Sequence, residues 1–292
     1  MFKGVGTALI TPFNEDFTID YESLRKIVNF QINGGVDSLI VLGTTGESPV
    51  FDYEERSRII KAVIEENKGR IPVIVGTGTN NPAKVIQYNQ QAKELGADGL
   101  LIVNPYYNKS TQSGLVEYFK YITVDNSLPI IIYNVPSRTG MNMMPDTEIK
   151  IHKACPNVVG VKEACGSISQ VAQLIAMKPE NLSVLSGNDD QILPIMALGG
   201  DGVISVVSNI LPREVRNLTH ALLEKDIDKA RKLNNTYLGI SNLLFVETSP
   251  SPVKYAASIL GLCKNVVRMP LIPASANTEK LIRDELEKLG IQ

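Results

Sequence analysis

One lysine, Lys162, ends an uncharged run of the chain, Asn157–Val161, that is mostly apolar. A lysine buried there is poorly hydrated, and loss of hydration disfavours the ammonium form and lowers the pKa. Moving that pKa from about 10.4 to about 7 corresponds to roughly 4–5 kcal/mol of lost stabilisation of the charged form. The neutral amine could attack a carbonyl carbon and form an imine. The alternative is a structural lysine paired with a carboxylate.

Imine chemistry also needs groups that move protons, and hydroxyl side chains follow other apolar runs. Tyr133 closes the run before that of Lys162, and Thr44 lies in the Gly43–Glu47 loop, whose sequence is GTTGE. Both hydroxyls could relay protons to and from an imine, and Tyr107 could connect the relay to solvent. Taken singly, Thr44 could instead serve a tight turn between glycines, and Tyr107 could pack at the rim.

Two features could hold a carboxylate close to that lysine. The backbone N–H groups of Gly43 and Gly46, with the Thr45 hydroxyl, form a loop suited to binding an anion. Arg138 follows a turn at Pro136 and offers a planar pair of donors for a carboxylate, unless it is a surface arginine in a salt bridge. Each of these two features could therefore bind a carboxylate.

The elements that must position these residues are short apolar runs. They are continuous rather than alternating, which is typical of strands buried on both faces of a parallel sheet. The runs span 4–10, 38–42, 72–76, 98–103, 129–133, 158–162, 183–187 and 202–207. Segments of helical period separate them, and glycines at 34–35, 69 and 96 fall where such helices should end.

Eight strand–helix units predict an α/β fold, a (β/α)8 TIM barrel, at residues 1–224. An open doubly wound sheet is the competing fold, but no GxGxxG motif opens the first helix. Residues 225–292 are predicted to form a C-terminal helical extension, with helices over 226–245, 252–260 and 277–289. In a barrel the residues after the strands meet at one mouth, so the candidate residues should converge.

Composition excludes several other classes of function. The chain has 292 residues and a formal net charge of −2, so we expect no nucleic-acid partner. Three cysteines and two histidines are too few for a disulfide framework or a histidine-rich metal site, so we expect no metal. The first residues do not read as a signal peptide and no run is long enough to span a membrane, so we expect a cytoplasmic protein.

Four stretches of the chain resemble the dihydrodipicolinate synthase family, within the pyruvate-dependent aldolase group that includes N-acetylneuraminate lyase. They are Gly43–Glu47, Pro105–Asn108, Tyr133–Gly140 and Gly160–Ala164. The resemblance spans essentially the whole chain, from Gly4 to Lys254. It implies condensation of pyruvate with L-aspartate-4-semialdehyde to 4-hydroxy-tetrahydrodipicolinate, on the route to diaminopimelate and lysine, with no metal or organic cofactor.

The resemblance also implies roles for particular residues. Lys162 would form the Schiff base with pyruvate, and Tyr133, Thr44 and Tyr107 would relay protons, with Tyr107 supplied by a neighbouring subunit. Arg138 would receive the carboxylate of the semialdehyde. The residues expected around pyruvate are Thr45, which holds its carboxylate, and the backbones of Gly187 and Ile204. The implied assembly is a homotetramer built from two tight dimers.

A candidate effector site is implied at the subunit interface, where some members bind lysine as an inhibitor. The matching residues are Ser48, Asn80 and Tyr106. In place of two histidines and a glutamate, this chain has Tyr53, Arg56 and Lys84. A lysine side chain in place of an acid repels the ammonium of the effector, so we expect lysine to inhibit weakly or not at all.

Two other functions stay open at this point. One is a pyruvate-dependent aldolase for a sugar acid such as N-acetylneuraminate or 2-keto-3-deoxygluconate. Sialic-acid lyases, however, lack the Ser-Arg-Thr-Gly continuation that contains Arg138. The other is a barrel without catalysis that serves as a small-molecule sensor, against which the joint presence of Lys162, Tyr133, Thr44 and Arg138 argues.

Overall fold

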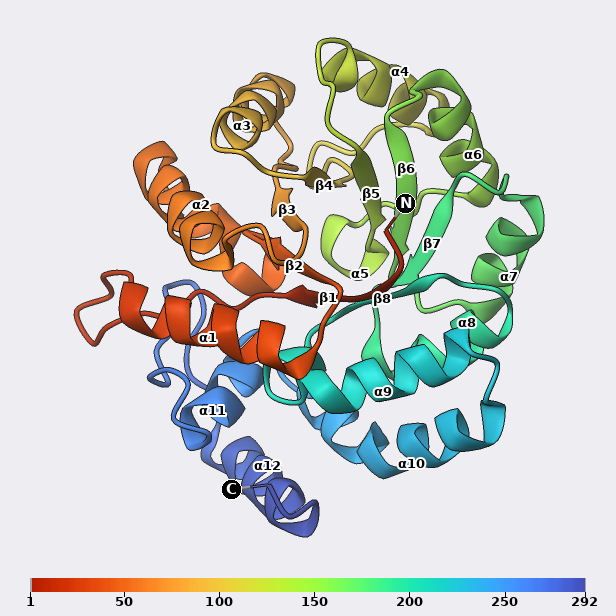
Figure 1. Cartoon of the computed structure of the whole chain (residues 1–292). Coiled ribbons are helices and arrows are strands. Elements are labelled where there is room, and N and C mark those ends of the chain that lie inside the picture. Colours follow the sequence, from red (N-terminus) through yellow and green to blue (C-terminus); the bar gives the residue numbers. More distant parts are fainter. Residues whose placement is uncertain (1, 292) are drawn as a thin grey trace.

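The computed structural model describes residues 2–291, which form a closed barrel of eight parallel strands surrounded by helices (Figure 1). Each strand pairs with the next along the chain, and the last pairs with the first. The predicted TIM barrel is therefore confirmed. The strands are β1 (Gly4–Ala8), β2 (Ser38–Val41), β3 (Val73–Gly76), β4 (Gly99–Val103), β5 (Ile130–Asn134), β6 (Val158–Glu163), β7 (Ser183–Ser186) and β8 (Gly202–Ser205).

Almost every strand residue is buried, which explains why the runs read as continuously apolar. The strand β6 extends one residue beyond the predicted end, to Glu163. Its pairing with β5 places Tyr133 beside Lys162, and Asn134 beside Glu163. Because neighbouring residues on a strand point to opposite faces, these two pairs lie on opposite faces of the barrel wall.

Helices connect the strands and cover the outside of the barrel (Figure 1). Their ends follow local sequence signals: Asp52 and Glu55 form a capping box, and Gly35 ends the first helix in a left-handed conformation. The helices of the barrel are α1 (Tyr21–Gly34), α2 (Tyr53–Asn67), α3 (Pro82–Glu94), α4 (Gln112–Thr123), α5 (Pro136–Thr139), α6 (Pro145–Ala154), α7 (Ile168–Met177), α8 (Ile192–Ala197) and α9 (Pro212–Leu223).

The C-terminal extension consists of α10 (Ile227–Leu243), α11 (Ser251–Ile259) and α12 (Ala276–Lys288), each within two residues of its predicted ends. Figure 1 shows these helices beside α9 and α1, outside the ring. The apolar side chains of Ile240 and Val253 belong to the same hydrophobic core as the barrel. Among residues 2–291, no helix combines the length and the apolar character that a membrane crossing requires.

The extension is also fixed to the loop after β2. Lys254 of α11 pairs with Glu47, the last residue of the GTTGE loop, through a Nζ–Oε1 contact of 2.5 Å. Both side chains are at most 1% exposed, and the Arg268 backbone N–H donates to the other Glu47 oxygen. Residues far along the chain therefore hold the loop that carries Thr44 and Thr45.

Candidate active site

Lys162 lies on β6 with its side chain buried at the barrel centre. The residue is 5% exposed, and its Nζ lies 4.2 Å from the centroid of the Tyr133 ring. Burial lowers the pKa of Lys162 to about 7, against an opposing attraction from the Asp189 carboxylate. Among residues 2–291, no carboxylate forms an ion pair with Lys162. A neutral amine is therefore well populated at neutral pH, as the apolar run predicted.

Asp189, to which sequence reasoning gave no role, is already bound by other groups. Its carboxylate accepts hydrogen bonds from the Ser205 hydroxyl and from the backbone N–H groups of Val206 and Val207. These donors satisfy its charge, which leaves Lys162 without a close counterion. The signal that could have identified Asp189 is its position in the loop after β7, at the mouth of the barrel.

Tyr133 lies close to this amine, and Thr44 lies near Tyr133. Tyr133 is in register with Lys162, so both side chains are on the inner face of the barrel. Burial raises the pKa of Tyr133 to about 12, although the Arg138 charge and the nearby Thr44 hydroxyl lower it in part. The phenol thus stays protonated at neutral pH and can donate a proton to a group formed on Lys162.

The residues expected around pyruvate are all buried. Thr45 is 5% exposed and Ile204 of β8 is 1% exposed. Gly187 follows β7, and a Cβ atom there would lie 3.1 Å from Lys162 Cε and 2.7 Å from Ala164 Cβ. Only glycine at this position leaves the Lys162 side chain free of these close contacts, so Gly187 lies directly against Lys162.

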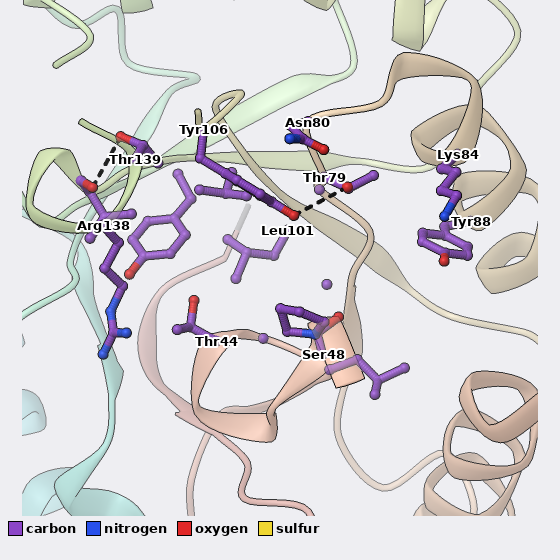
Figure 2. A pocket seen from close by; sticks show the side chains of 18 of the residues that line it. Thr44, Ser48, Thr79, Asn80, Lys84, Tyr88, Leu101, Tyr106, Arg138 and Thr139 are labelled. Carbon is purple, nitrogen blue, oxygen red and sulfur yellow. Dashed lines mark hydrogen bonds between the residues drawn. The ribbon is translucent and has the colours of Figure 1, made fainter. Parts of the chain in front are cut away.

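A cavity of about 480 Å³ opens beside these residues. Figure 2 shows Thr44 and Arg138 at one end of it, Lys84 and Tyr88 at the other, and Ser48 between them. Its lining contains Tyr133 but not Lys162, Thr45, Gly187 or Ile204. The cavity therefore reaches Tyr133 and Thr44, whereas Lys162 lies outside its lining.

Arg138 is exposed at this mouth. Its guanidinium donates to the backbone oxygen of Ser249, at 3.2 Å, and forms no ion pair within residues 2–291. Its donors are therefore available to a carboxylate, rather than committed to a surface salt bridge. Tyr107 lies apart: it has a φ of 69°, is 89% exposed and does not line the cavity. Within one chain, it does not join Tyr133 and Thr44.

The candidate effector residues Ser48, Asn80 and Tyr106 line the far part of the same cavity. Arg56 is 2% exposed there and donates to the Ser48 hydroxyl and to the Gly76 carbonyl, each at 2.7 Å. Its guanidinium also stacks on the Tyr88 ring, 4.0 Å from the centroid. Lys84 lines this part too, whereas Tyr53 does not and instead stacks against Tyr88. No acidic residue lines the described cavity.

Comparison with known proteins agrees with this arrangement. The model of the dihydrodipicolinate synthetase family matches residues 1–289. The 4-hydroxy-tetrahydrodipicolinate synthase of Alkaliphilus oremlandii is 46% identical over 291 residues, which cover 100% of both chains. The crystal structure of dihydrodipicolinate synthase from Thermotoga maritima superposes with a TM-score of 0.98 at 43% identity, covering 100% of both chains.

A third relative carries a bound substrate. The chloride-inhibited dihydrodipicolinate synthase from Acinetobacter baumannii, crystallised with pyruvate, has a TM-score of 0.98 and 38% identity, and the match covers 100% of both chains. Fold, length and sequence thus agree from end to end with proteins of one family. The chain, with its buried lysine at the end of β6, belongs to the dihydrodipicolinate synthetase family.

Proposed function

We propose that this chain is a 4-hydroxy-tetrahydrodipicolinate synthase, which condenses pyruvate with L-aspartate-4-semialdehyde through an imine on Lys162. The observation that carries the proposal is the buried Lys162 amine, which lies against Tyr133 and forms no ion pair with a carboxylate among residues 2–291. The family match and the full-length relatives support the same reaction.

The reaction begins when the neutral Nζ of Lys162 attacks the carbonyl carbon of pyruvate. Loss of water, with one proton supplied through Tyr133, gives a protonated imine. This imine withdraws electrons and allows a methyl proton to leave as an enamine forms. The enamine carbon then attacks the aldehyde carbon of the second substrate, whose oxygen takes up a proton. The amino group of that substrate attacks the imine carbon, which closes the ring and releases Lys162 as a free amine.

The other site residues have proposed roles in these steps. Tyr133 and Thr44, which line the same cavity, relay the protons, and Tyr107 of a neighbouring subunit connects them to solvent. Thr45 holds the pyruvate carboxylate, the Gly187 and Ile204 backbones line its pocket, and Arg138 receives the carboxylate of the semialdehyde. Free donors on Arg138 favour this small charged substrate over a sugar acid.

Trapping with borohydride tests the proposal. The protein is incubated with pyruvate and sodium borohydride, and the modified residue is identified by peptide mass spectrometry. We expect one adduct, on Lys162, and none on Lys254, the other fully buried lysine, whose amine is paired with Glu47. Absence of an adduct on Lys162 would instead favour a non-catalytic sensor. Release of pyruvate from N-acetylneuraminate or 2-keto-3-deoxygluconate, with no turnover of the semialdehyde, would indicate the sugar-acid aldolase.

We also propose a homo-oligomer, a tetramer formed as a dimer of dimers, in which Tyr107 completes the site of a neighbour. The exposure of Tyr107 in the single chain supports this proposal. Mixing inactive Lys162→Ala chains with Tyr107→Phe chains should restore activity above that of either parent, because hybrid dimers contain one complete site. Unchanged activity after subunit exchange would contradict it.

Weak inhibition by L-lysine is a further proposal, for the far part of the cavity. Arg56 and Lys84 are positively charged, and no acidic residue lies in the described lining of the cavity. These charges repel the two ammonium groups of L-lysine. Steady-state assays should show little inhibition at submillimolar lysine.

A cytoplasmic location is proposed as well, because all three cysteines are free thiols, which suits a reducing compartment. Cell fractionation tests this location.

A further inference from the structure

Behind the reactive pair, on the outer face of the barrel wall, lies a second pair of residues that the reaction does not use. Asn134 follows Tyr133 and Glu163 follows Lys162, and the two are in register on β5 and β6. The Asn134 amide donates to both Glu163 oxygens, at 3.0 and 3.2 Å. Both residues are 0% exposed, so the contact is shielded from water.

Glu163 is also bonded to the turn that follows its strand and to the helix layer. Its carboxylate accepts from the Cys165 backbone N–H at 2.9 Å and from the Gln170 amide of α7 at 3.4 Å. Its backbone oxygen accepts from the Gly187 N–H at 2.7 Å. The Asn134 and Gln170 amides also donate to the Asn142 side chain and the Met143 carbonyl. The Cys165 N–H has Glu163 as its acceptor, so removing the carboxylate would leave that donor unpaired and free the Asn134 amide from β6.

A second acid, Glu148 of α6, lies against this cluster. It is 0% exposed, and neither of its oxygens receives a hydrogen bond from a donor within residues 2–291. A bare carboxylate without donors is very costly in such a place, whereas a protonated carboxyl can donate to an acceptor. The acceptor in contact with it is Glu163, and the other titratable group near both acids is the Cys165 thiol.

The direction of the pKa shift agrees with this geometry. Burial, with the neighbouring Glu163 charge, raises the pKa of Glu148 well above its usual range, and a hydrogen bond between the two acids contributes. Burial also raises the pKa of Glu163, but Asn134, Cys165 and Glu148 oppose the rise. Both directions favour a shared proton on Glu148, whose oxygens have no donor among residues 2–291, over one on Glu163, which accepts several hydrogen bonds.

We propose that Glu163 is a positioning residue that, through Asn134, holds Lys162 and Tyr133 in register, and that Glu148 supports it as a protonated hydrogen-bond donor. The Asn134–Glu163 contact fixes the two strand ends from outside, directly behind the amine and the phenol. An error of about 1 Å in such a placement can cost about a hundredfold in rate. This inference rests on the proposed chemistry of Lys162.

Two isosteric substitutions separate the roles of the acids. In Glu163→Gln, an amide oxygen can keep the bonds of Oε1, but an N–H₂ group then replaces Oε2 and faces the Asn134 and Gln170 donors, so we expect imine formation with pyruvate to slow by about 10- to 100-fold. Glu148→Gln keeps a neutral donor of the same shape, so imine formation should stay within about threefold of the wild-type rate constant. The infrared band of a buried protonated carboxyl should be present in the wild type and lost in Glu148→Gln.

The rate constant is measured by quenching pyruvate mixtures with borohydride at timed intervals, at several pH values. The amplitude of trapping reports the fraction of folded, competent sites, and the rate constant reports their geometry, so loss of fold is distinguished from loss of position. If Glu163→Gln does not fold, Asn134→Ala breaks the same contact and should slow imine formation similarly. An unaltered rate constant in these variants, equal slowing in Glu148→Gln, or no protonated carboxyl band would overturn the proposal. Absence of trapping in the wild type would instead refute the Schiff-base chemistry.

Discussion

Two lysines are buried in this molecule, and they occupy opposite environments. Lys254 of α11 is 0% exposed, pairs with Glu47, donates to the Val266 carbonyl at 2.8 Å and lies over the Phe13 ring. Lys162 of β6 is 5% exposed, faces an aromatic ring and has no carboxylate within ion-pair distance among residues 2–291. One amine has a counterion and the other does not.

Burial lowers the pKa of both amines, but Glu47 acts against that shift at Lys254. A paired ammonium can stay charged in the interior, where it holds the GTTGE loop against the extension. An unpaired amine instead gives up its proton and becomes a nucleophile. The difference between a structural lysine and a reactive one therefore lies in its partner and not in its burial.

The largest effect should come from replacing the unpaired amine. Lys162→Met removes the only atom proposed to bond pyruvate, so we expect kcat to fall by about 10⁴-fold or more, with no borohydride adduct. Coupled assays that follow the semialdehyde-dependent reaction measure this loss. Lys254→Met is the matched control and should retain an adduct on Lys162, because its amine takes no part in imine formation.

Stability should respond in the opposite sense. Lys254→Met leaves Glu47 buried with only the Arg268 N–H as donor, so we expect a loss of about 3–5 kcal/mol in the free energy of unfolding. Lys162→Met removes an amine whose burial is costly, and at pH 7 the fold should gain up to about 4 kcal/mol. Denaturant unfolding compares the two variants, and destabilisation by both would show that Lys162 has a partner after all.

The sequence predicts these two lysines unequally. Lys162 is evident because it ends an apolar run, and the spacing of such runs also predicts the barrel and brings Tyr133 beside it. The pairing of Lys254 with Glu47 joins residues separated by most of the chain, and no local pattern encodes such a contact. Glu148 is hidden for a similar reason, because an acid in the first turn of a helix normally reads as exposed.

A smaller effect should follow from crowding Lys162 without changing its charge. In Gly187→Ala the new methyl group would press on Lys162 Cε and on Ala164, so the amine must shift. We expect kcat/KM for pyruvate to fall by about a hundredfold, through displacement of the reacting nitrogen. Single-turnover trapping rates measure the effect. Gly166→Ala is the control. Its backbone has a positive φ, which strains an alanine, but the added Cβ would meet no atom within 4 Å and so would not press on Lys162.

The smallest effect expected is the pH dependence of the first step. The pKa of Lys162 is about 7 in the fold, well below its ordinary value, so the reactive neutral amine predominates above pH 7 and the inert ammonium below it. The rate of imine formation should therefore fall about tenfold for each pH unit below 7 and level off above it. Asp189→Asn removes the carboxylate that favours the ammonium, so the midpoint of the profile should move to lower pH. A wild-type profile that still rises tenfold per unit at pH 9 would mean that Lys162 keeps an ordinary pKa, and the contrast with Lys254 would fail.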